Sequence, residues 1–285
     1  MDKTLLREGT VFNAYLISEA GIPKYIAKEL ILNTQKGKRK YINELQILKN
    51  LLGKKGYAQL AKESETDFFI EYISHLNYDA QQWFDLLAKN RNRRDELARL
   101  IVNYNQTEIK AQITDQFLIN TIKSFGKGLL KKKLDKQFVW CCVKSILSEV
   151  SVPKNEKTLL HNDFTTNNIL CNESGEIYII DFDRGTTATK FVFRDILYFI
   201  LRSQEILEWT WQYELFCQYY MLRNINESKE NFYRDLYYTC IRLCLFYVHE
   251  KNIQESNLYK NMKYLINKQN AQAMLERMWE KTRDN

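Results

Sequence analysis

The stretch that decides the fold is LLHNDFTTNNILCNESGEIYIIDFD, residues 159–183. Two short apolar runs, ILC and IYII, flank an Asn-Glu-Ser-Gly turn, and this pattern predicts a β-hairpin. In a hairpin, the start of the first strand lies beside the end of the second. We therefore expect Asn168 and Asp181 to emerge at the same open end, with Asp163 in the loop just before them.

These three polar side chains suit phosphoryl transfer, which needs positioning and charge neutralisation more than covalent help from the protein. Asp181 and Asn168 offer the hard oxygen ligands that Mg²⁺ takes together with phosphates and water. Asp163 is placed to orient an attacking hydroxyl and to accept its proton. The alternative is ordinary turn chemistry, since Asp and Asn are common in loops. The spacing of the three residues and a Lys/Glu pair upstream weigh against that alternative.

The upstream pair lies in the first fifty residues. The patterns of residues 11–17 and 25–32 predict two strands, and alternation puts Lys28 on the same face as two large aliphatic residues. The pattern of residues 40–52 predicts a helix with Glu44 at the border of its buried stripe, where an acid is costly unless it is paired. We expect Lys28 to be its partner. The alternative is an edge-strand lysine with its head in water.

A family resemblance follows from these residues. The pattern HNDFTTNN followed by IDFD, at residues 161–168 and 180–183, resembles the aminoglycoside phosphotransferase/choline kinase superfamily over roughly residues 10–203. The resemblance implies an α+β, bilobal protein-kinase-like fold. Its small β-rich N-terminal nucleotide-binding lobe would span residues 1–73, and its larger, mainly helical catalytic and substrate lobe residues 74–285. It also implies ATP and Mg²⁺ as cofactors.

The resemblance suggests roles for further residues. Lys28, held by Glu44, would contact the α- and β-phosphates, and Ile73 would belong to the nucleotide site. His161 would support the catalytic loop rather than act as the base. Asp183 would touch either a second metal or the loop backbone.

Two more residues carry expectations with alternatives. Asp195, which opens a helical run, is either a plain N-cap or a carboxylate that reaches back to the catalytic loop. Arg184 would meet an anionic sugar. The single glycine in residues 8–13 departs from the glycine-rich phosphate loop of the family, and no Ala-Pro-Glu-like element follows Asp183, which disfavours protein phosphorylation.

The acceptor is the least determined part. DFDRG at residues 181–185 resembles lipopolysaccharide Kdo kinases, whereas HND at residues 161–163 resembles choline kinases. We expect a kinase that phosphorylates a hydroxyl of a small-molecule or glycan/glycolipid substrate. The alternatives are a choline- or aminoglycoside-type kinase and a catalytically silent kinase-like structural protein. Two interpretations fit the aromatic residues of the C-terminal helices: they form an aromatic wall for the quaternary ammonium of choline, or they are plain helical core. These residues are Trp209, Trp211, Tyr213 and Phe216.

Composition sets broad limits. Nine Gly and two Pro favour long helices over a many-stranded sandwich, and six Cys without a C-x-x-C pair indicate a reducing, cytoplasmic setting. The net charge of +7 mildly favours anionic partners. Of the basic clusters, residues 127–136 form either a solvated face or an amphipathic helix for peripheral membrane contact. No nucleic-acid module accompanies them, and we expect no nucleic-acid partner and no secretory signal.

Overall fold

The computed structural model describes residues 1–9, 12–31, 34–109, 140, 158–188, 193–225, 228–246 and 256–283. The chain groups into two compact units. The described residues of the first are chiefly Met1–Gln82 and His161–Thr186, and those of the second are chiefly Trp83–Gln106 and the residues from Thr187 onward. The predicted boundary near residue 73 stays a prediction.

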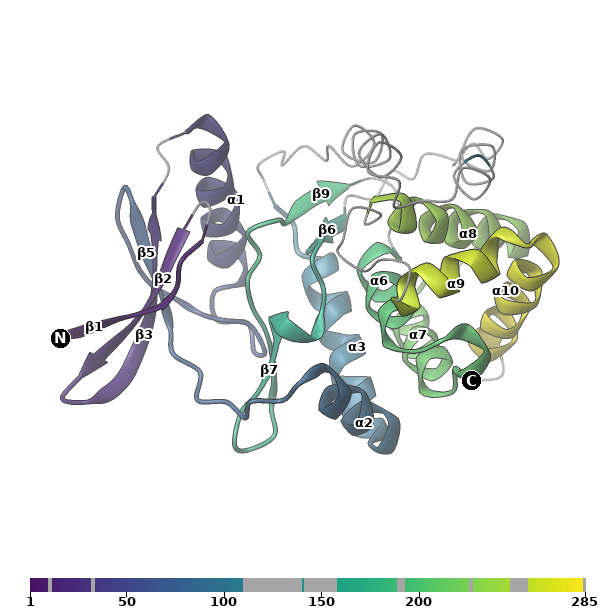
Figure 1. Cartoon of the computed structure of the whole chain (residues 1–285), viewed down its shortest axis with the longest axis horizontal. Helices are drawn as coiled ribbons and strands as arrows, with labels where there is room; N and C mark the ends of the chain where they lie inside the picture. The colour runs from purple at the N-terminus through teal and green to yellow at the C-terminus, as the bar shows by residue number, and fades with distance from the viewer. Residues whose placement is uncertain are drawn as a thin grey trace. The chain divides into compact units, whose positions relative to one another are not determined.

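The elements of the first unit are labelled in Figure 1. They are β1 (Asp2–Arg7), β2 (Phe12–Glu19), β3 (Ile22–Leu30), α1 (Gln35–Leu51), β4 (Leu60–Glu63), β5 (Asp67–Glu71), a short 3₁₀ turn (Thr166–Asn168), β7 (Ile169–Cys171) and β8 (Ile177–Ile179). The elements of the second are α2 (Ala80–Lys89) and β9 (Thr186–Ala188), which both begin in the first unit, and α3 (Arg91–Asn105), β6 (Thr158–Leu160), α6 (Arg194–Ser203), a 3₁₀ turn (Ile206–Glu208), α7 (Trp211–Leu222), α8 (Lys229–Phe246), α9 (Asn257–Ile266) and α10 (Lys268–Arg283).

The first unit is built on a five-stranded antiparallel sheet in the order β1-β2-β3-β5-β4. The turn between β2 and β3 consists of Ala20 and Gly21, both with positive φ, 51° and 76°. Positive φ at both central residues is the geometry of the two-residue turn whose twist matches antiparallel strands. The hairpin fixes the register that places Lys28 opposite Ala14 on one side and opposite Phe68 on the other.

Helix α1 packs one face against this sheet. Its N-cap, Thr34, accepts a hydrogen bond from the backbone N–H of Gly37 at 3.1 Å. Tyr41 and Leu48 from the helix join Phe68 and Ile70 from β5 in a buried cluster. Removing these side chains from water is the main stabilisation of the unit, at about 1.5–3 kcal/mol for each fully buried large side chain.

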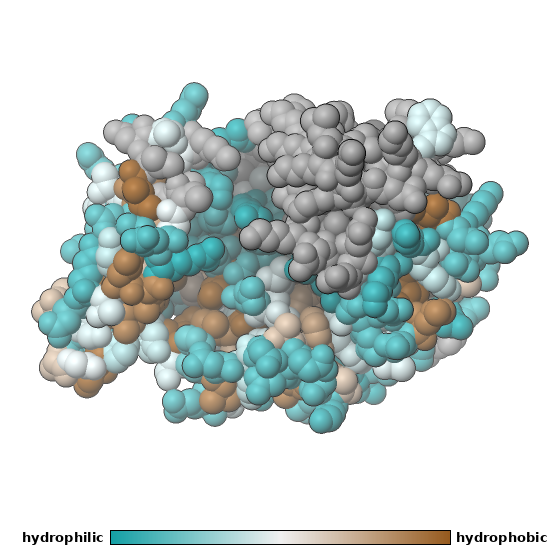
Figure 2. Space-filling model, in the orientation of Figure 1, coloured by the Kyte–Doolittle hydropathy of each residue, from teal (hydrophilic) through white to brown (hydrophobic). Residues whose placement is uncertain are grey.

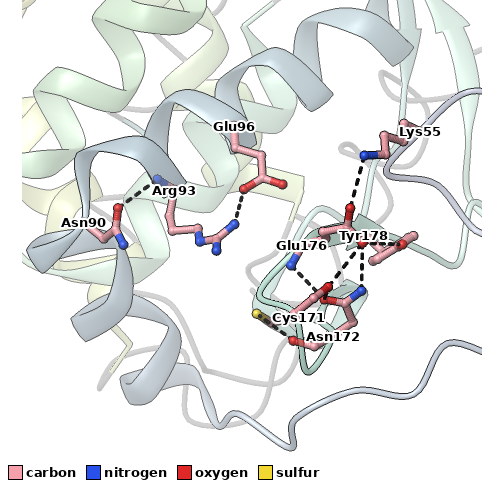
Figure 3. Close-up of polar contacts among 9 residues, drawn as sticks. Lys55, Asn90, Arg93, Glu96, Cys171, Asn172, Glu176 and Tyr178 are labelled. Carbon is pink, nitrogen blue, oxygen red and sulfur yellow. Dashed lines mark hydrogen bonds and ion pairs between the residues drawn. The ribbon is translucent and has the colours of Figure 1, made fainter.

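Backbone contacts join the β7–β8 hairpin to earlier segments of the first unit. Tyr57 pairs with Ile179 and Leu76 with Cys171 as isolated β-bridges. The hairpin turn is closed by Asn172, whose side-chain oxygen accepts from the backbone N–H of Glu176 at 2.8 Å (Figure 3). These contacts hold the hairpin, and with it the loop before β7, against the residues that precede α2.

The second unit is helical, and its core is aromatic. Helix α7 packs on α3 and on α10, and α6 packs on α8 and α9. Asn90 caps α3, and Arg93 pairs with Glu96 on the surface of that helix (Figure 3). A buried Asn105 donates to the Leu159 carbonyl at 2.7 Å and accepts from the Tyr219 hydroxyl at 2.8 Å, tying β6 to the helices.

Most predicted elements of the first unit are present, with small shifts of their ends. β2, β3, α1 and the β7–β8 hairpin confirm the predictions. β1 and β4 are findings that the sequence patterns did not indicate. The predicted amphipathic segment 127–136 lies outside the described residues.

Three of the cysteines lie in the protein interior. Cys171, Cys217 and Cys240 are free and buried. Among the described residues, no helix is both long and apolar enough to cross a bilayer. Figure 2 shows hydrophobic residues at separate places among hydrophilic ones on the face it displays. Exposed large hydrophobic side chains include Leu5, Leu6, Ile22 and Leu207.

Candidate functional site

The open end of the β7–β8 hairpin brings together the polar residues predicted from the sequence. Ile180 donates its backbone N–H to the Asn168 carbonyl at 3.0 Å, so the residue before Asp181 lies directly beside Asn168. The Asn168 side chain donates to the Asp163 carbonyl at 2.8 Å. The predicted juxtaposition of Asn168, Asp181 and the loop carrying Asp163 is therefore confirmed.

His161 supports this arrangement from inside. Its ring is fully buried, and its Nε2 donates to the Ile180 carbonyl at 2.8 Å. The ring also lies between Phe164 and Phe182, at centroid distances of 5.8 and 4.6 Å. The imidazole thus links the start of the loop that carries Asp163 to the end of β8, and its supporting role in catalysis stays a prediction.

Two residues of the site adopt a left-handed backbone. Asn162 has a φ of 65° and Asp181 a φ of 62°. Residues other than glycine adopt this conformation at a cost of about 1–2 kcal/mol, and they persist there only where the surroundings hold them. Asn162 is held because its side chain donates to the Arg184 carbonyl at 2.8 Å and to the Thr186 hydroxyl at 2.7 Å.

Lys28 lies between two carboxylates. Its Nζ is 2.6 Å from Glu44 Oε1 and 2.6 Å from Asp181 Oδ1. The Glu44 side chain is 1% exposed, the Lys28 side chain 12% and the Asp181 side chain 29%. The predicted pair of Lys28 and Glu44 is confirmed, and the ammonium also reaches the hairpin end.

The charges of this group perturb one another. Burial alone would lower the pKa of Lys28, but Asp181 and Glu44 outweigh burial and raise that pKa above its ordinary value. Burial raises the pKa of Glu44 to about 7, although Lys28 opposes the rise. Lys28 lowers the pKa of Asp181 to about 2, against the effect of burial. Lys28 is therefore a fixed positive charge, and Asp181 is ionised at neutral pH.

Asp163 has a different environment. Burial raises the pKa of its carboxyl, and the nearby Arg184 guanidinium opposes that rise. Arg184 Nη1 lies 3.3 Å from Asp163 Oδ2, and the arginine side chain is half-exposed. This contact was not predicted from the sequence, because the pattern indicates only that Arg184 follows Asp183.

Asp183 has a partner that the sequence analysis missed. Lys40 of α1 places its Nζ 2.5 Å from Asp183 Oδ2. Neither of the predicted partners of Asp183, a second metal or the loop backbone, accounts for this contact. Lys40 lies one helical turn before Glu44 and so on the same face of the helix, but it belongs to a basic cluster and is 143 positions from Asp183, so no local pattern identified the partner.

Asp195 and Ile73 are two further residues that were predicted for the site. Asp195 lies in the first turn of α6, whose N-cap is Phe193, so the N-cap interpretation is wrong. Its carboxylate is buried in the second unit and accepts from the Tyr104 hydroxyl at 2.9 Å. The alternative role, a reach to the catalytic loop, stays a prediction. Ile73 is partly buried and packs against the α1–β5 cluster of the first unit.

Of the two interpretations of the aromatic residues 209–216, an aromatic wall or plain core, the structure supports plain core. Trp209, Trp211, Tyr213 and Phe216 are all buried in the second unit, with exposed fractions of 6% or less. Trp209 packs edge-on against Tyr213, and Trp211 stacks on Phe84. These four side chains therefore confirm the plain-core interpretation.

The single glycine of the loop between β1 and β2 is sterically required. A Cβ built on Gly9 would come within 2.2 Å of the Phe12 carbonyl oxygen. A separation below about 3.0 Å cannot be tolerated without moving backbone. Gly9 therefore approaches the Phe12 backbone closely, at the position where the resemblance expects a phosphate-covering loop.

The donor atoms at the hairpin end suit Mg²⁺. The Asn168 amide nitrogen is bound to the Asp163 carbonyl, which leaves its side-chain oxygen as the atom that can face a cation. Asp181 adds a carboxylate that Lys28 keeps ionised. Among the described residues, no group of three or more His, Cys, Asp or Glu could hold a metal ion. Asn168 and Asp181 therefore suit a cation that shares its coordination with phosphates and water.

Comparison with known proteins supports the fold. No protein-family model and no curated protein matches the chain. A choline/ethanolamine kinase family protein from Mesorhizobium loti is similar in structure, with a TM-score of 0.64 at 9% identity over 98% of this chain and 92% of that one. Choline kinase LicA from Streptococcus pneumoniae has a TM-score of 0.58 at 14% identity, with 94% of each chain covered.

An aminoglycoside phosphotransferase solved with streptomycin and ATP is also similar, with a TM-score of 0.58 at 16% identity over 90% of this chain and 89% of that one. At such identities the likeness establishes the fold. The predicted protein-kinase-like fold, shared with aminoglycoside phosphotransferases and choline kinases, is confirmed. The local likeness of residues 181–185 to Kdo kinases stays a prediction.

Proposed function

We propose that this chain is an ATP- and Mg²⁺-dependent phosphotransferase that phosphorylates a hydroxyl of a small-molecule or glycan/glycolipid acceptor. The observation that carries the proposal is the chain of contacts from Glu44 through Lys28 to Asp181, beside Asn168 and the Asp163 loop. A fixed cation, two oxygen donors and a separate carboxylate are the groups that phosphoryl transfer requires. The fold, which is that of solved small-molecule kinases, agrees with this chemistry.

In this proposal Asn168 and Asp181 hold Mg²⁺, which neutralises charge on the triphosphate when it is bound. Lys28 contacts the α- and β-phosphates. Glu44 matters here because Lys28 needs a second anionic partner when Asp181 turns to a cation. Glu44 is almost fully buried and keeps the ammonium in place. Ile73 stays assigned to the nucleotide site.

Asp163 is the proposed general base. Its carboxylate belongs to the loop that Asn168 and His161 hold in place, and its pKa is raised by burial. A carboxylate with a raised pKa is a stronger base and accepts a hydroxyl proton more readily. The proposed step is transfer of the acceptor hydroxyl proton to Asp163 as the acceptor oxygen bonds to the γ-phosphorus and the bond to the β-phosphate oxygen breaks.

Arg184 bears on the choice of acceptor. Its half-exposed guanidinium lies against the proposed base. A positive charge at this position repels a cationic acceptor and attracts an anionic one. We therefore favour a neutral or anionic sugar over choline or an aminoglycoside. The alternative acceptors keep support from the solved kinases of similar fold.

The test is a panel of acceptors with radiolabelled ATP and Mg²⁺: acidic sugars, a glycolipid, choline, ethanolamine and an aminoglycoside. We expect transfer to a sugar hydroxyl, with turnover abolished in Asp163→Asn while ATP binding is retained. Asp2→Asn, at an exposed position of β1, is the matched control and is expected to behave as wild type.

Three results would change the proposal. Turnover of choline but not of acidic sugars would replace the acceptor class and leave the reaction standing. Normal turnover in Asp163→Asn would remove Asp163 from its role. Absence of phosphate transfer to every acceptor of the panel, together with no nucleotide binding, would favour the catalytically silent kinase-like protein.

A further inference from the structure

Helix α1 contributes two side chains of opposite charge to the site. Glu44 is an acid that binds a lysine, and Lys40 is a lysine that binds an acid. Their i, i+4 spacing puts both on the same face of the helix. The helix is thereby linked to Asp181 through Lys28 and to Asp183 directly.

The Lys40–Asp183 pair is held from both sides. Its side chains are 26% and 19% exposed, so solvent screens the pair only in part. Phe182, between the two acids, is fully buried and lies against the rings of His161 and Tyr57. The peptide that carries Asp183 is therefore fixed by packing, while Lys40 extends from a helix whose neighbouring residue Tyr41 is in the core.

Lys28 and Lys40 differ in how many carboxylate partners each would keep if a metal ion bound to the neighbouring aspartate. Lys28 contacts both Glu44 and Asp181, so it keeps one carboxylate when the other binds a cation. In the part of the chain that the structure describes, Asp183 is the one ion-pair partner of Lys40. A metal on Asp183 Oδ2 would have to displace Lys40 and leave it partly buried beside a like charge, which is unfavourable.

We propose that Lys40 is a positioning residue whose ammonium serves Asp183 as a fixed counter-ion in place of a second metal. Nucleotide then binds with a single divalent cation, at Asn168 and Asp181. This inference rests on the proposed function, because it presumes that the nucleotide binds at the hairpin end. The sequence left two partners open for Asp183, a second metal or the loop backbone, and this inference assigns it Lys40 instead.

The test counts bound cations with Mn²⁺, which prefers hard oxygen ligands as Mg²⁺ does and whose free form is seen by electron paramagnetic resonance. Mn²⁺ is titrated into wild type with ADP, and binding to ADP alone is subtracted. We expect one Mn²⁺ per wild-type complex and two in Lys40→Met. The double variant Lys40→Met/Asp183→Asn should return to one, which locates the added site.

Lys38→Met is the matched control. Lys38 is exposed on the same helix, so the variant makes the same change of charge and leaves Asp183 paired. It should bind one Mn²⁺, as wild type does. Far-UV circular dichroism of each variant checks that α1 is folded, and the wild-type count is a test even if a variant does not fold.

Each other outcome overturns the inference. Two Mn²⁺ in the wild-type complex would show that Lys40 does not exclude a second metal, although the proposed function would stand. One Mn²⁺ in folded Lys40→Met would show that the lysine is not what limits the count. Absence of any ADP-dependent Mn²⁺ binding in wild type would remove the proposed function and this inference together.

Discussion

Replacing Lys28 with methionine is expected to destabilise the first unit, and replacing Glu44 as well is expected to restore part of the loss. Glu44 is 1% exposed, and Lys28 is the cation beside it at 2.6 Å. Removing one partner of a buried ion pair costs about 3–5 kcal/mol, because the remaining charge has neither water nor a counter-ion. Lys28→Met/Glu44→Gln removes the charge of the fully buried acid, while the partly exposed Asp181 loses its lysine in both variants, so the double variant should be more stable than Lys28→Met by about 2 kcal/mol or more.

The penalty should depend on pH. Burial holds the pKa of Glu44 at about 7 against an ordinary value of 4.5, and Lys28 opposes that rise, so the pKa rises further in Lys28→Met. Between the two pKa values the folded state binds more protons than the unfolded state, so stability falls as pH increases. Lys28→Met should therefore lose more stability than wild type between pH 5 and pH 8, at about 1.4 kcal/mol for each unit of pKa difference.

The assay is urea unfolding followed by far-UV circular dichroism, with hydrogen exchange of the α1 peptide to assign the change. Tryptophan fluorescence does not suit this purpose, because Trp83, Trp140, Trp209, Trp211 and Trp279 all belong to the second unit. Equal stability of Lys28→Met and wild type at pH 8 would refute the reasoning. So would a double variant no more stable than Lys28→Met.

Two further predictions concern the catalytic loop. Arg184→Gln removes the positive charge that opposes the rise in the pKa of Asp163, so the acid limb of the profile of kcat/KM against pH should move to higher pH. Arg184→Lys keeps a positive charge and should move the limb less. An unchanged acid limb in Arg184→Gln would contradict the contact between Arg184 and Asp163. His161→Phe leaves the Ile180 carbonyl without its donor, and urea unfolding should show a loss of about 1–3 kcal/mol; a loss well below 1 kcal/mol would mean that the hydrogen bond is not needed.

Much of the site was predictable because it depends on local geometry. A hairpin brings its first and last residues together wherever the turn is short, so Asn168 and Asp181 could be placed side by side from the sequence. Lys28 and Glu44 were paired because alternation along a strand and periodicity along a helix both pointed them toward the core. Burying one of these charges alone would be too costly.

Other features depend on contacts that no local pattern encodes. The pair of Lys40 and Asp183 joins residues 143 positions apart, and Lys40 sits in a basic cluster that is typical of a solvated helix face. The strands β1 and β4 lie at the two edges of the sheet and are largely exposed, so they lack the alternation that marks a half-buried strand. The left-handed φ of Asp181 has no signal in the sequence beyond the tolerance of Asp for that conformation.

The central claim is that a metal–nucleotide complex binds where Asp181 and Asn168 meet. Isothermal titration calorimetry of ATP, with Mg²⁺ and then with the metal chelated, tests this claim for wild type and Asp181→Asn. We expect wild type to bind ATP more tightly with Mg²⁺, and Asp181→Asn to lose that difference while Lys28 stays paired with Glu44. Equal Mg²⁺ dependence in both proteins, or no ATP binding by wild type, would contradict the account.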